Sequence, residues 1–94
     1  MATHLNTCKK VIKIQNRLGL HARAAAKLVK VATAWDAKLT LSHMGRNVNA
    51  KSILGLLMLA APMGSEVEIV AEGVDAQEAL EAVETLFNQR FDEE

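Results

Sequence analysis

The sequence is poor in several residue types that mark common classes of protein. Its 94 residues include one cysteine, Cys8, so no disulfide can form within the chain, and we expect a reducing compartment. Aromatic residues make up 3% of the chain, too few for a platform on which nucleic-acid bases stack. Residues 1–10 lack the apolar core of a signal peptide, and no apolar run reaches the about 18 residues of a membrane span. We therefore expect a cytoplasmic protein with no membrane insertion.

An excess of charge of either sign is also missing. Lys and Arg total 11, Asp and Glu also total 11, and the formal net charge is zero. This balance argues against bulk electrostatic binding to nucleic acid or to an anionic membrane. Hydrophobic residues make up 50% of the chain, mostly Ala, Leu and Val, which is typical of a globular domain. We expect a single domain over residues 1–94 with a loose N-terminal tail at residues 1–8, in which Cys8 has no role.

Several short segments alternate apolar and polar residues, as strands with one wet face do. Strands are predicted over residues 9–15, 37–42 and 66–72. A further short strand at residues 47–50 would return from a hairpin turn at residues 43–46. Half-polar strands of this kind favour an antiparallel sheet that carries helices on one face only.

Apolar residues recur at helical spacing in three other segments. Helices are predicted over residues 22–33, over residues 51–59 with Ser52 as N-cap, and after Asp75, which is the predicted N-cap of the last helix. The second helix holds more apolar residues than one buried stripe requires, so part of it should stay exposed. Those residues are Ile53, Leu54, Leu56, Leu57 and Met58. An exposed apolar helix face is typical of a docking surface.

The candidate reactive residue is His21, which stands directly before the alanine-rich first helix. Gly19 precedes it by two residues and Arg23 follows it by two. Backbone amides are unpaired at the start of a helix and the summed peptide dipole is positive there, so such an end binds phosphate. A histidine in this place is a candidate nucleophile that could carry a phosphoryl group. The alternative is that His21 only caps the helix weakly.

Two stretches of the sequence resemble the signatures of one known family. They are Gly19-Leu20-His21-Ala22-Arg23, followed by Ala25-Ala26, and residues 49–57, which read Asn-Ala-Lys-Ser-Ile-Leu-Gly-Leu-Leu. Both are similar to the signatures of HPr, the histidine-containing phosphocarrier of the bacterial phosphoenolpyruvate:sugar phosphotransferase system. The resemblance covers residues 9–94. It implies an α+β fold, an open-faced βαββαβα sandwich with a four-stranded antiparallel sheet and three helices on one face.

The resemblance also implies the roles of individual residues. His21 would accept a phosphoryl group on Nδ1 from phosphorylated enzyme I and pass it to an enzyme IIA domain, and Arg23 would stabilise the phosphate. The protein would then be a carrier and not an enzyme, a monomer that needs no cofactor and no metal. Ser52 falls on the serine that a regulatory kinase or phosphorylase acts on in some bacteria. The docking face for enzyme I and enzyme IIA would include Ile53, Leu54 and Leu57.

Two features depart from a simple match to the sugar-system form. Ala24 stands where the family usually has proline, a residue that suits the first turn of a helix. The end of the chain, residues 86–88 and 91–93, looks more like the nitrogen-related paralogue, whereas residues 51–55 look more like the sugar-system form. The sequence therefore leaves the branch open.

Other functions remain as alternatives. A regulatory relative could bind a transcription factor or a kinase through Ser52 without transferring phosphate, although such relatives usually lack the active histidine. An ordinary interaction module would leave the spacing of His21 and Arg23 unexplained. His4 and His43 are expected to be solvated, and the three histidines lack metal-ligand spacing. Trp35 is expected to pack after the first helix.

Overall fold

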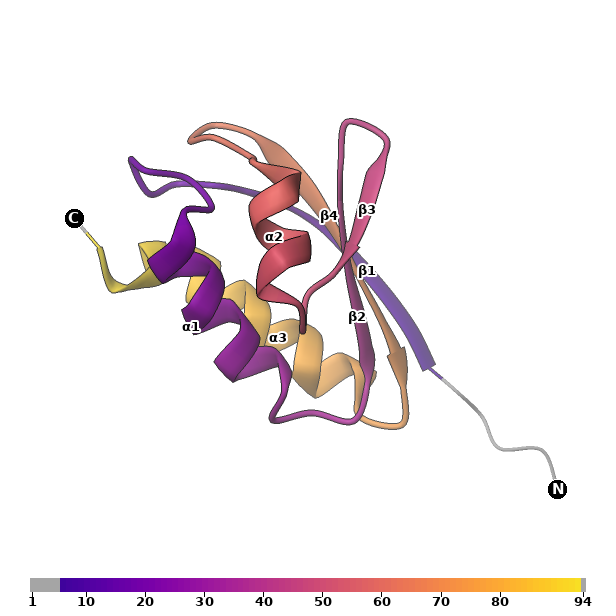
Figure 1. Cartoon of the computed structure of the whole chain (residues 1–94). Coiled ribbons are helices and arrows are strands. Elements are labelled where there is room, and N and C mark those ends of the chain that lie inside the picture. The colour runs from indigo at the N-terminus through magenta and orange to yellow at the C-terminus, as the bar shows by residue number, and fades with distance from the viewer. Residues whose placement is uncertain (1–5, 94) are drawn as a thin grey trace, which may run out of the picture.

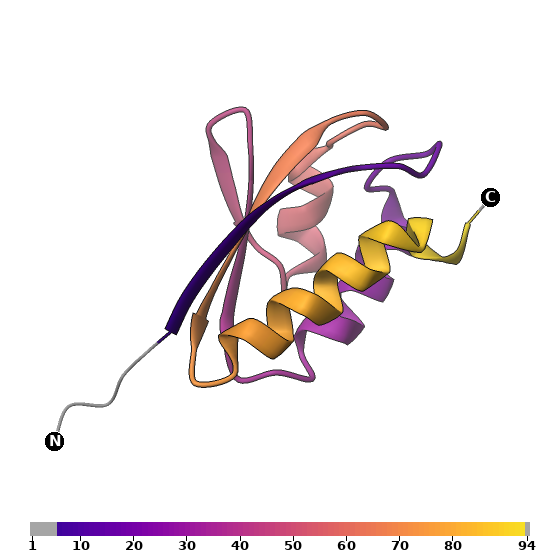
Figure 2. The same cartoon turned by 180° about the vertical axis from the view of Figure 1, so that it is seen from behind.

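The computed structural model describes residues 6–93. Its elements, in chain order, are β1 (Asn6–Lys13), α1 (Ala22–Ala32), β2 (Lys38–His43), β3 (Arg46–Asn49), α2 (Ile53–Leu59), β4 (Glu66–Gly73), α3 (Ala76–Asn88) and a short 3₁₀ turn, η1 (Arg90–Asp92). Figure 1 shows all three α-helices on one side of the sheet, and the reverse view in Figure 2 agrees. Among the helices of residues 6–93, none is both long and apolar enough to cross a bilayer.

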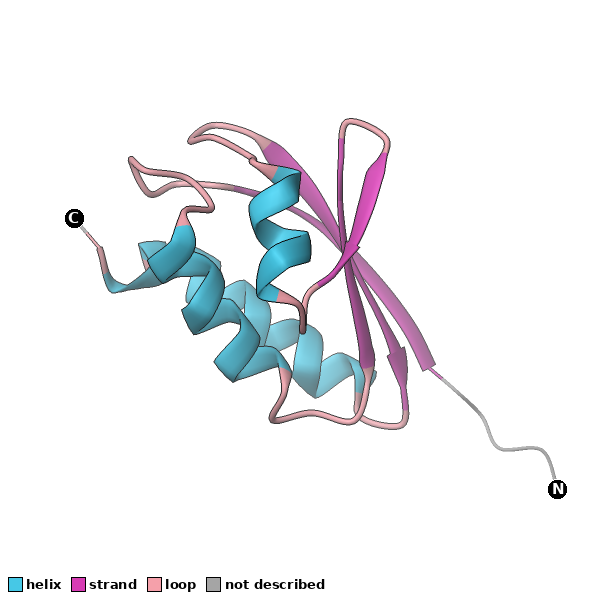
Figure 3. Cartoon of the chain, viewed as in Figure 1, coloured by secondary structure: helices cyan, strands magenta, loops and turns pink. Residues whose placement is uncertain are grey.

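The four strands form one open sheet in the spatial order β1-β4-β2-β3. Every neighbouring pair runs antiparallel, with β1 and β2 flanking β4 and with β3 at the edge as the return strand of a hairpin. One face of this sheet carries helices and the other carries none (Figure 3). The prediction of an open-faced α+β sandwich with a four-stranded antiparallel sheet is therefore confirmed.

The core fills the layer between the sheet and the helices. In β2 and β4 alternate side chains are buried in that layer, because successive side chains of a strand point to opposite faces. The buried strand residues include Ile12, Leu39, Leu41, Val67, Ile69 and Ala71. The helices contribute Ala25, Leu28, Leu56, Val83 and Phe87, all fully buried. Trp35 is partly buried against this core, as expected.

The structure corrects two predictions about the fold. The tail predicted at residues 1–8 is wrong for residues 6–8, because β1 begins at Asn6, where it pairs with Gly73 at the end of β4. Residues 1–5, including His4, lie outside the described part of the chain. Asp75 is the N-cap residue of α3, as predicted, but its side chain makes no capping hydrogen bond. Its carboxylate instead accepts hydrogen bonds from the backbone N–H groups of Asp36 (2.9 Å) and Ala37 (2.8 Å) and so ties two loops together.

Candidate functional site

A tight loop between β1 and α1 positions His21. Gly19 in this loop has φ +65°, and a Cβ added there would lie 2.5 Å from the carbonyl oxygen of Ala61 and 2.9 Å from Cα of Pro62. The next residue, Leu20, donates its N–H to the same Ala61 oxygen at 3.0 Å. Only glycine allows both this backbone conformation and this close approach. The loop is therefore fixed against the segment that follows α2.

His21 is the residue directly before α1, and its backbone is extended (φ −81°, ψ 179°). Its carbonyl accepts the first helical hydrogen bond, from the N–H of Ala25 at 2.8 Å, but its side chain makes no capping hydrogen bond. The alternative that His21 acts as a side-chain cap is therefore wrong. The N–H groups of Ala22, Arg23 and Ala24 have no acceptor within residues 6–93, and the first turn of α1 carries no acidic side chain. This helix end keeps its positive potential and its free donors.

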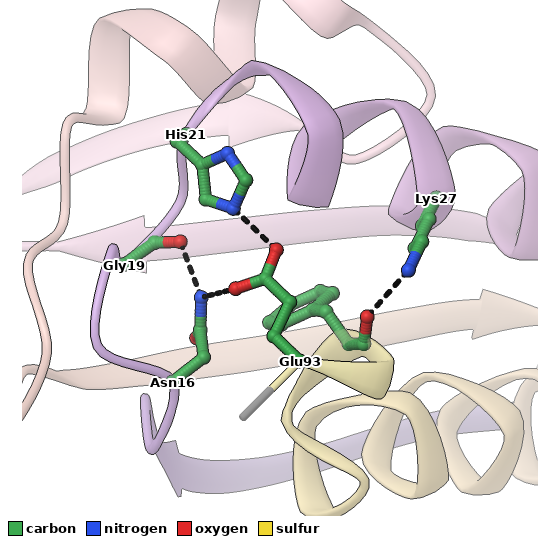
Figure 4. A network of polar contacts seen from close by, with 6 residues as sticks. Asn16, Gly19, His21, Lys27 and Glu93 are labelled. Carbon is green, nitrogen blue, oxygen red and sulfur yellow. Dashed lines mark hydrogen bonds and ion pairs between the residues drawn. The ribbon is translucent and has the colours of Figure 1, made fainter.

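The imidazole of His21 is held by a residue from the far end of the chain. Nε2 lies 2.5 Å from Oε2 of Glu93, and the other carboxylate oxygen of Glu93 accepts a hydrogen bond from Nδ2 of Asn16 at 3.0 Å (Figure 4). Asn16 is fully buried, and the same Nδ2 also donates to the carbonyl of Gly19 at 2.7 Å. For Nδ1 of His21 no hydrogen-bond partner lies within residues 6–93. The network thus holds one ring nitrogen and leaves the other available.

Glu93 is ionised in this network. Burial by itself would raise the pKa of its carboxyl, but hydrogen bonds from Asn16 and His21, with electrostatic attraction to the His21 ring and to the ammonium group of Lys27, outweigh burial and lower the pKa from the ordinary 4.5. The Glu93 side chain is 15% exposed and the His21 side chain 25%. An ionised carboxylate only accepts hydrogen bonds, so Nε2 of His21 is the donor in this pair.

The turn η1 brings Glu93 back to α1. Phe91 is fully buried and packs against Phe87 of α3 with ring centroids 4.9 Å apart. Nζ of Lys27 donates to the carbonyl of Phe91 at 2.6 Å (Figure 4). Arg90, Phe91 and Asp92 all have positive φ, between 54° and 60°, a conformation that L-residues adopt only when the surroundings hold them. The burial of Phe91 and the hydrogen bond from Lys27 keep these three residues in that conformation.

Beside this network lies an open hollow of about 520 Å³. Its lining side chains come from the loop before α1, from α1 and from the end of the chain: Arg17, Leu18, Arg23, Lys27, Asp92 and Glu93. Three of these six are cations and two are anions. Arg23 itself is exposed. Three cations next to a helix N-terminus with free amides form a site that suits a phosphoryl group.

The helix α2 matches its prediction. Oγ of Ser52 accepts a hydrogen bond from the N–H of Gly55 at 3.1 Å, which confirms Ser52 as the N-cap. Ile53, Leu54 and Leu57 are 43%, 68% and 39% exposed, whereas Leu56 and Leu59 are buried. The helix therefore has a buried stripe and a separate exposed apolar face, as its surplus of apolar residues predicts.

Sequence reasoning missed the residues that hold His21. No local pattern in the sequence assigns a role at the site to Asn16, Lys27 or Glu93. The available signal was Phe91, a large apolar residue within an otherwise polar chain end, which needs a place to be buried. Nothing in the local pattern around Asn16 or Lys27 indicates contacts so distant along the chain.

No metal site competes with this interpretation in the part of the chain that the structure describes, where no three His, Cys, Asp or Glu side chains gather around a common point. The half-buried His43 lies at the β2–β3 turn, and its Nδ1 is 3.3 Å from the carbonyl oxygen of Glu66.

Comparison with known proteins relates this geometry to a family. The family described as "PTS HPr component phosphorylation site" matches residues 8–89. The phosphocarrier protein HPr of Treponema pallidum is 47% identical over 85 residues, which cover 90% of this chain and 97% of the relative. The phosphocarrier protein NPr of Escherichia coli K12 is 42% identical over 89 residues, which cover 94% and 99%.

The fold matches solved structures of the same family. The crystal structure of HPr-C-His from Thermoanaerobacter tengcongensis superposes with a TM-score of 0.89 at 38% identity and covers 93% of this chain and 98% of its own. The chain therefore belongs to the HPr family, whose members are phosphocarriers of the phosphotransferase system and not catalytic enzymes.

Proposed function

We propose that this phosphocarrier accepts a phosphoryl group on Nδ1 of His21 from phospho-enzyme I and donates it to an enzyme IIA domain. The single observation that supports this most is the state of the His21 ring: Nε2 is bound to Glu93 and Nδ1 has no partner within residues 6–93. Nδ1 sits on the residue that directly precedes the free amides of α1. A nucleophile and a set of phosphate-binding donors thus belong to the same helix end.

Arg23 is the proposed phosphate-stabilising side chain. It lines the cationic hollow together with Arg17 and Lys27, and it is exposed, so its guanidinium can approach a phosphoryl group without first leaving a buried partner. Phosphoryl transfer depends on positioning and on stabilising charge on the equatorial oxygens. The guanidinium and the backbone N–H groups can both position the phosphoryl group and stabilise its charge, so the transfer needs no metal and no cofactor.

The docking face that we propose for both partners consists of Ile53, Leu54 and Leu57 on α2. These side chains are exposed, and the segment after α2 contacts the His21 loop through Ala61. An apolar surface beside a reactive side chain can bind a partner and orient its phosphoryl donor together. Ser52, at the start of the same helix, is the proposed site of regulatory phosphorylation by a serine kinase.

The test is phosphorylation by purified enzyme I and phosphoenolpyruvate, followed by intact mass. The wild-type chain should gain one phosphoryl group that is labile in acid and stable in base, as expected for a phosphoramidate. The variant His21→Ala should gain none, whereas the control His43→Ala should behave as wild type. Full phosphorylation of His21→Ala would contradict the proposal.

The branch is tested in the same experiment. Enzyme I of the sugar system and its nitrogen-branch counterpart are offered separately, and the rates are compared. We propose the sugar system as the physiological branch, on the likeness of residues 51–55 and on HPr-named relatives of 45–49% identity. The nitrogen branch is favoured by the chain end and by NPr-named relatives of 42–44% identity. A faster transfer from the nitrogen-branch donor would reverse this assignment.

A further inference from the structure

A carboxylate held by several independent contacts lies against the proposed phosphate-accepting histidine. Oε2 of Glu93 is 2.5 Å from Nε2 of His21, Oε1 of Glu93 accepts from Asn16, and the preceding turn is anchored by buried Phe91 and by Lys27. A surface glutamate near a chain end would ordinarily be solvated, because ordering it costs conformational entropy. Here three left-handed residues in succession, 90–92, are held in place and put Glu93 at the ring.

We propose that Glu93 is the positioning residue of the transfer, holding the proton of His21 on Nε2 so that Nδ1 presents its lone pair to phosphorus. This inference rests on the proposed function, because it concerns how His21 is prepared for the same step.

The chemistry follows from the hydrogen-bonding roles of the two groups. A neutral imidazole carries one N–H, and a carboxylate can only accept, so the contact with Glu93 requires the N–H on Nε2. The tautomer with the proton on Nδ1 would place two lone pairs against each other at Nε2 and Oε2. The contact therefore selects the nucleophilic form at Nδ1, as a buried aspartate orients the histidine of a serine-protease triad.

The same contact stabilises charge during transfer. We take the donor to be a phosphorylated imidazole. The lone pair of Nδ1 forms the new N–P bond while the N–P bond of this donor breaks, and the electron pair of the broken bond returns to the donor nitrogen. The donor imidazole, protonated on its second nitrogen, leaves as a neutral ring. The His21 ring becomes a phosphorylated imidazolium that keeps its proton on Nε2. The ionised Glu93 lies 2.5 Å from that proton-bearing nitrogen and offsets the positive charge that develops there.

Several other charged groups lie near the contact between His21 and Glu93. Lys27 on α1 binds the carbonyl of Phe91, and Arg17 and Arg23 line the same hollow. Asp92 lines the same hollow beside Glu93, but no hydrogen bond or ion pair joins it to His21. The control therefore lies outside this hollow: Glu78→Gln in the first turn of α3 makes the same Glu→Gln change and removes one negative charge, and Glu78 is exposed and does not line the hollow.

The experiment combines ¹⁵N NMR of the His21 ring with transfer kinetics from phospho-enzyme I. In Glu93→Gln the amide can donate as well as accept, so the preference for one tautomer is lost. We expect the Nδ1–H form to become populated and the rate of phosphorylation to fall on the order of 10- to 100-fold, less than the about 10⁴-fold seen when a triad aspartate is replaced by asparagine. The final stoichiometry should remain one phosphoryl group per chain. Glu78→Gln should leave the tautomer unchanged and should change the rate by no more than about twofold.

The outcomes separate this proposal from the one it rests on. If wild type is phosphorylated at His21 and Glu93→Gln keeps both the wild-type tautomer and the wild-type rate, the positioning role is wrong and the carrier function stands. An equal loss of rate in Glu78→Gln would also overturn it, because the effect would then be one of net charge. If the wild-type chain accepts no phosphoryl group at His21, both proposals are wrong.

Discussion

Gly19 and Ala61 lie so close that a Cβ on Gly19 would come within 2.5 Å of the Ala61 carbonyl oxygen. This close approach packs the His21 loop against the segment that follows α2. The N–H of Leu20 adds a hydrogen bond to the same oxygen at 3.0 Å. The reactive histidine and the exposed face of α2 are thereby held in a fixed relation, although they come from different parts of the chain.

Replacing Gly19 by alanine should therefore cost both stability and site geometry. The Gly19→Ala variant must either abandon φ +65° or push the backbone away from Ala61, and we expect the free energy of unfolding to fall by about 2–4 kcal/mol. Gly45→Ala is the matched control, because Gly45 also has positive φ (+80°) but has open space where Cβ would lie. It should lose about 1 kcal/mol from backbone strain alone. Urea denaturation of both variants measures the difference, and equal losses would show that the contact with Ala61 can relax.

Ala24→Pro should be tolerated in spite of the buried position of Ala24. The N–H of Ala24 has no acceptor within residues 6–93, so proline removes no hydrogen bond there, and its fixed φ restricts the unfolded chain. We expect a gain of about 0.4–1 kcal/mol in unfolding free energy with an unchanged rate of phosphorylation. Ala24 is fully buried, so a destabilised variant would mean that the pyrrolidine ring does not fit. A slower transfer without destabilisation would mean that the Ala24 amide binds the phosphoryl group.

The sequence predicts the layers of this fold well because their signals are local. Strands alternate and helices repeat within a few residues, and the boundaries of β2, β3 and α2 fall within two positions of those expected. The start of β1 was placed too late, since Asn6 is in the strand because Gly73 of β4 lies beside it. Its own polar neighbours along the chain do not indicate that pairing.

The site shows the same division between local and distant causes. His21 at a helix start, with Arg23 two residues later, can be recognised from the sequence, whereas Glu93 contacts His21 across 72 positions of the chain. Asp75 gives a further example, because its carboxylate finds amides 38 and 39 positions away and not those of its own helix. A carboxylate binds the donors that the folded structure brings to it, and a local pattern cannot predict which donors those will be.

Ser52→Asp should leave the fold intact and slow the transfer. Aspartate caps a helix as well as serine does, and its charge suits a helix N-terminus, so the melting temperature should be unchanged or slightly higher. The carboxylate would stand beside the exposed Ile53 and Leu54, where a bound partner would have to desolvate it, and we expect phosphorylation by enzyme I to slow about tenfold.

Ser52→Ala is the opposite control. It loses the bond from Gly55 and about 1 kcal/mol of stability but should keep its transfer rate. Unchanged transfer in Ser52→Asp would place the docking face elsewhere.

The pair of His21 and Glu93 should stabilise the native state in a pH-dependent way. The folded pKa of Glu93 is lowered from 4.5, so its contribution to stability is fully present above pH 4.5 and is lost as the pH falls through the lower, folded value. Removing the carboxylate from its charged hydrogen bonds should cost about 1–3 kcal/mol at pH 7. A double-mutant cycle of Glu93→Gln and His21→Ala isolates the pair from the hydrogen bond that Glu93 accepts from Asn16 and from its electrostatic attraction to Lys27. The coupling free energy from denaturant unfolding should stay favourable down to about pH 4.5 and decline at lower pH.

A coupling free energy near zero at pH 7 would mean that the 2.5 Å contact adds nothing to stability. A coupling free energy that grew as Glu93 became protonated would have the wrong sign for an ionised acceptor.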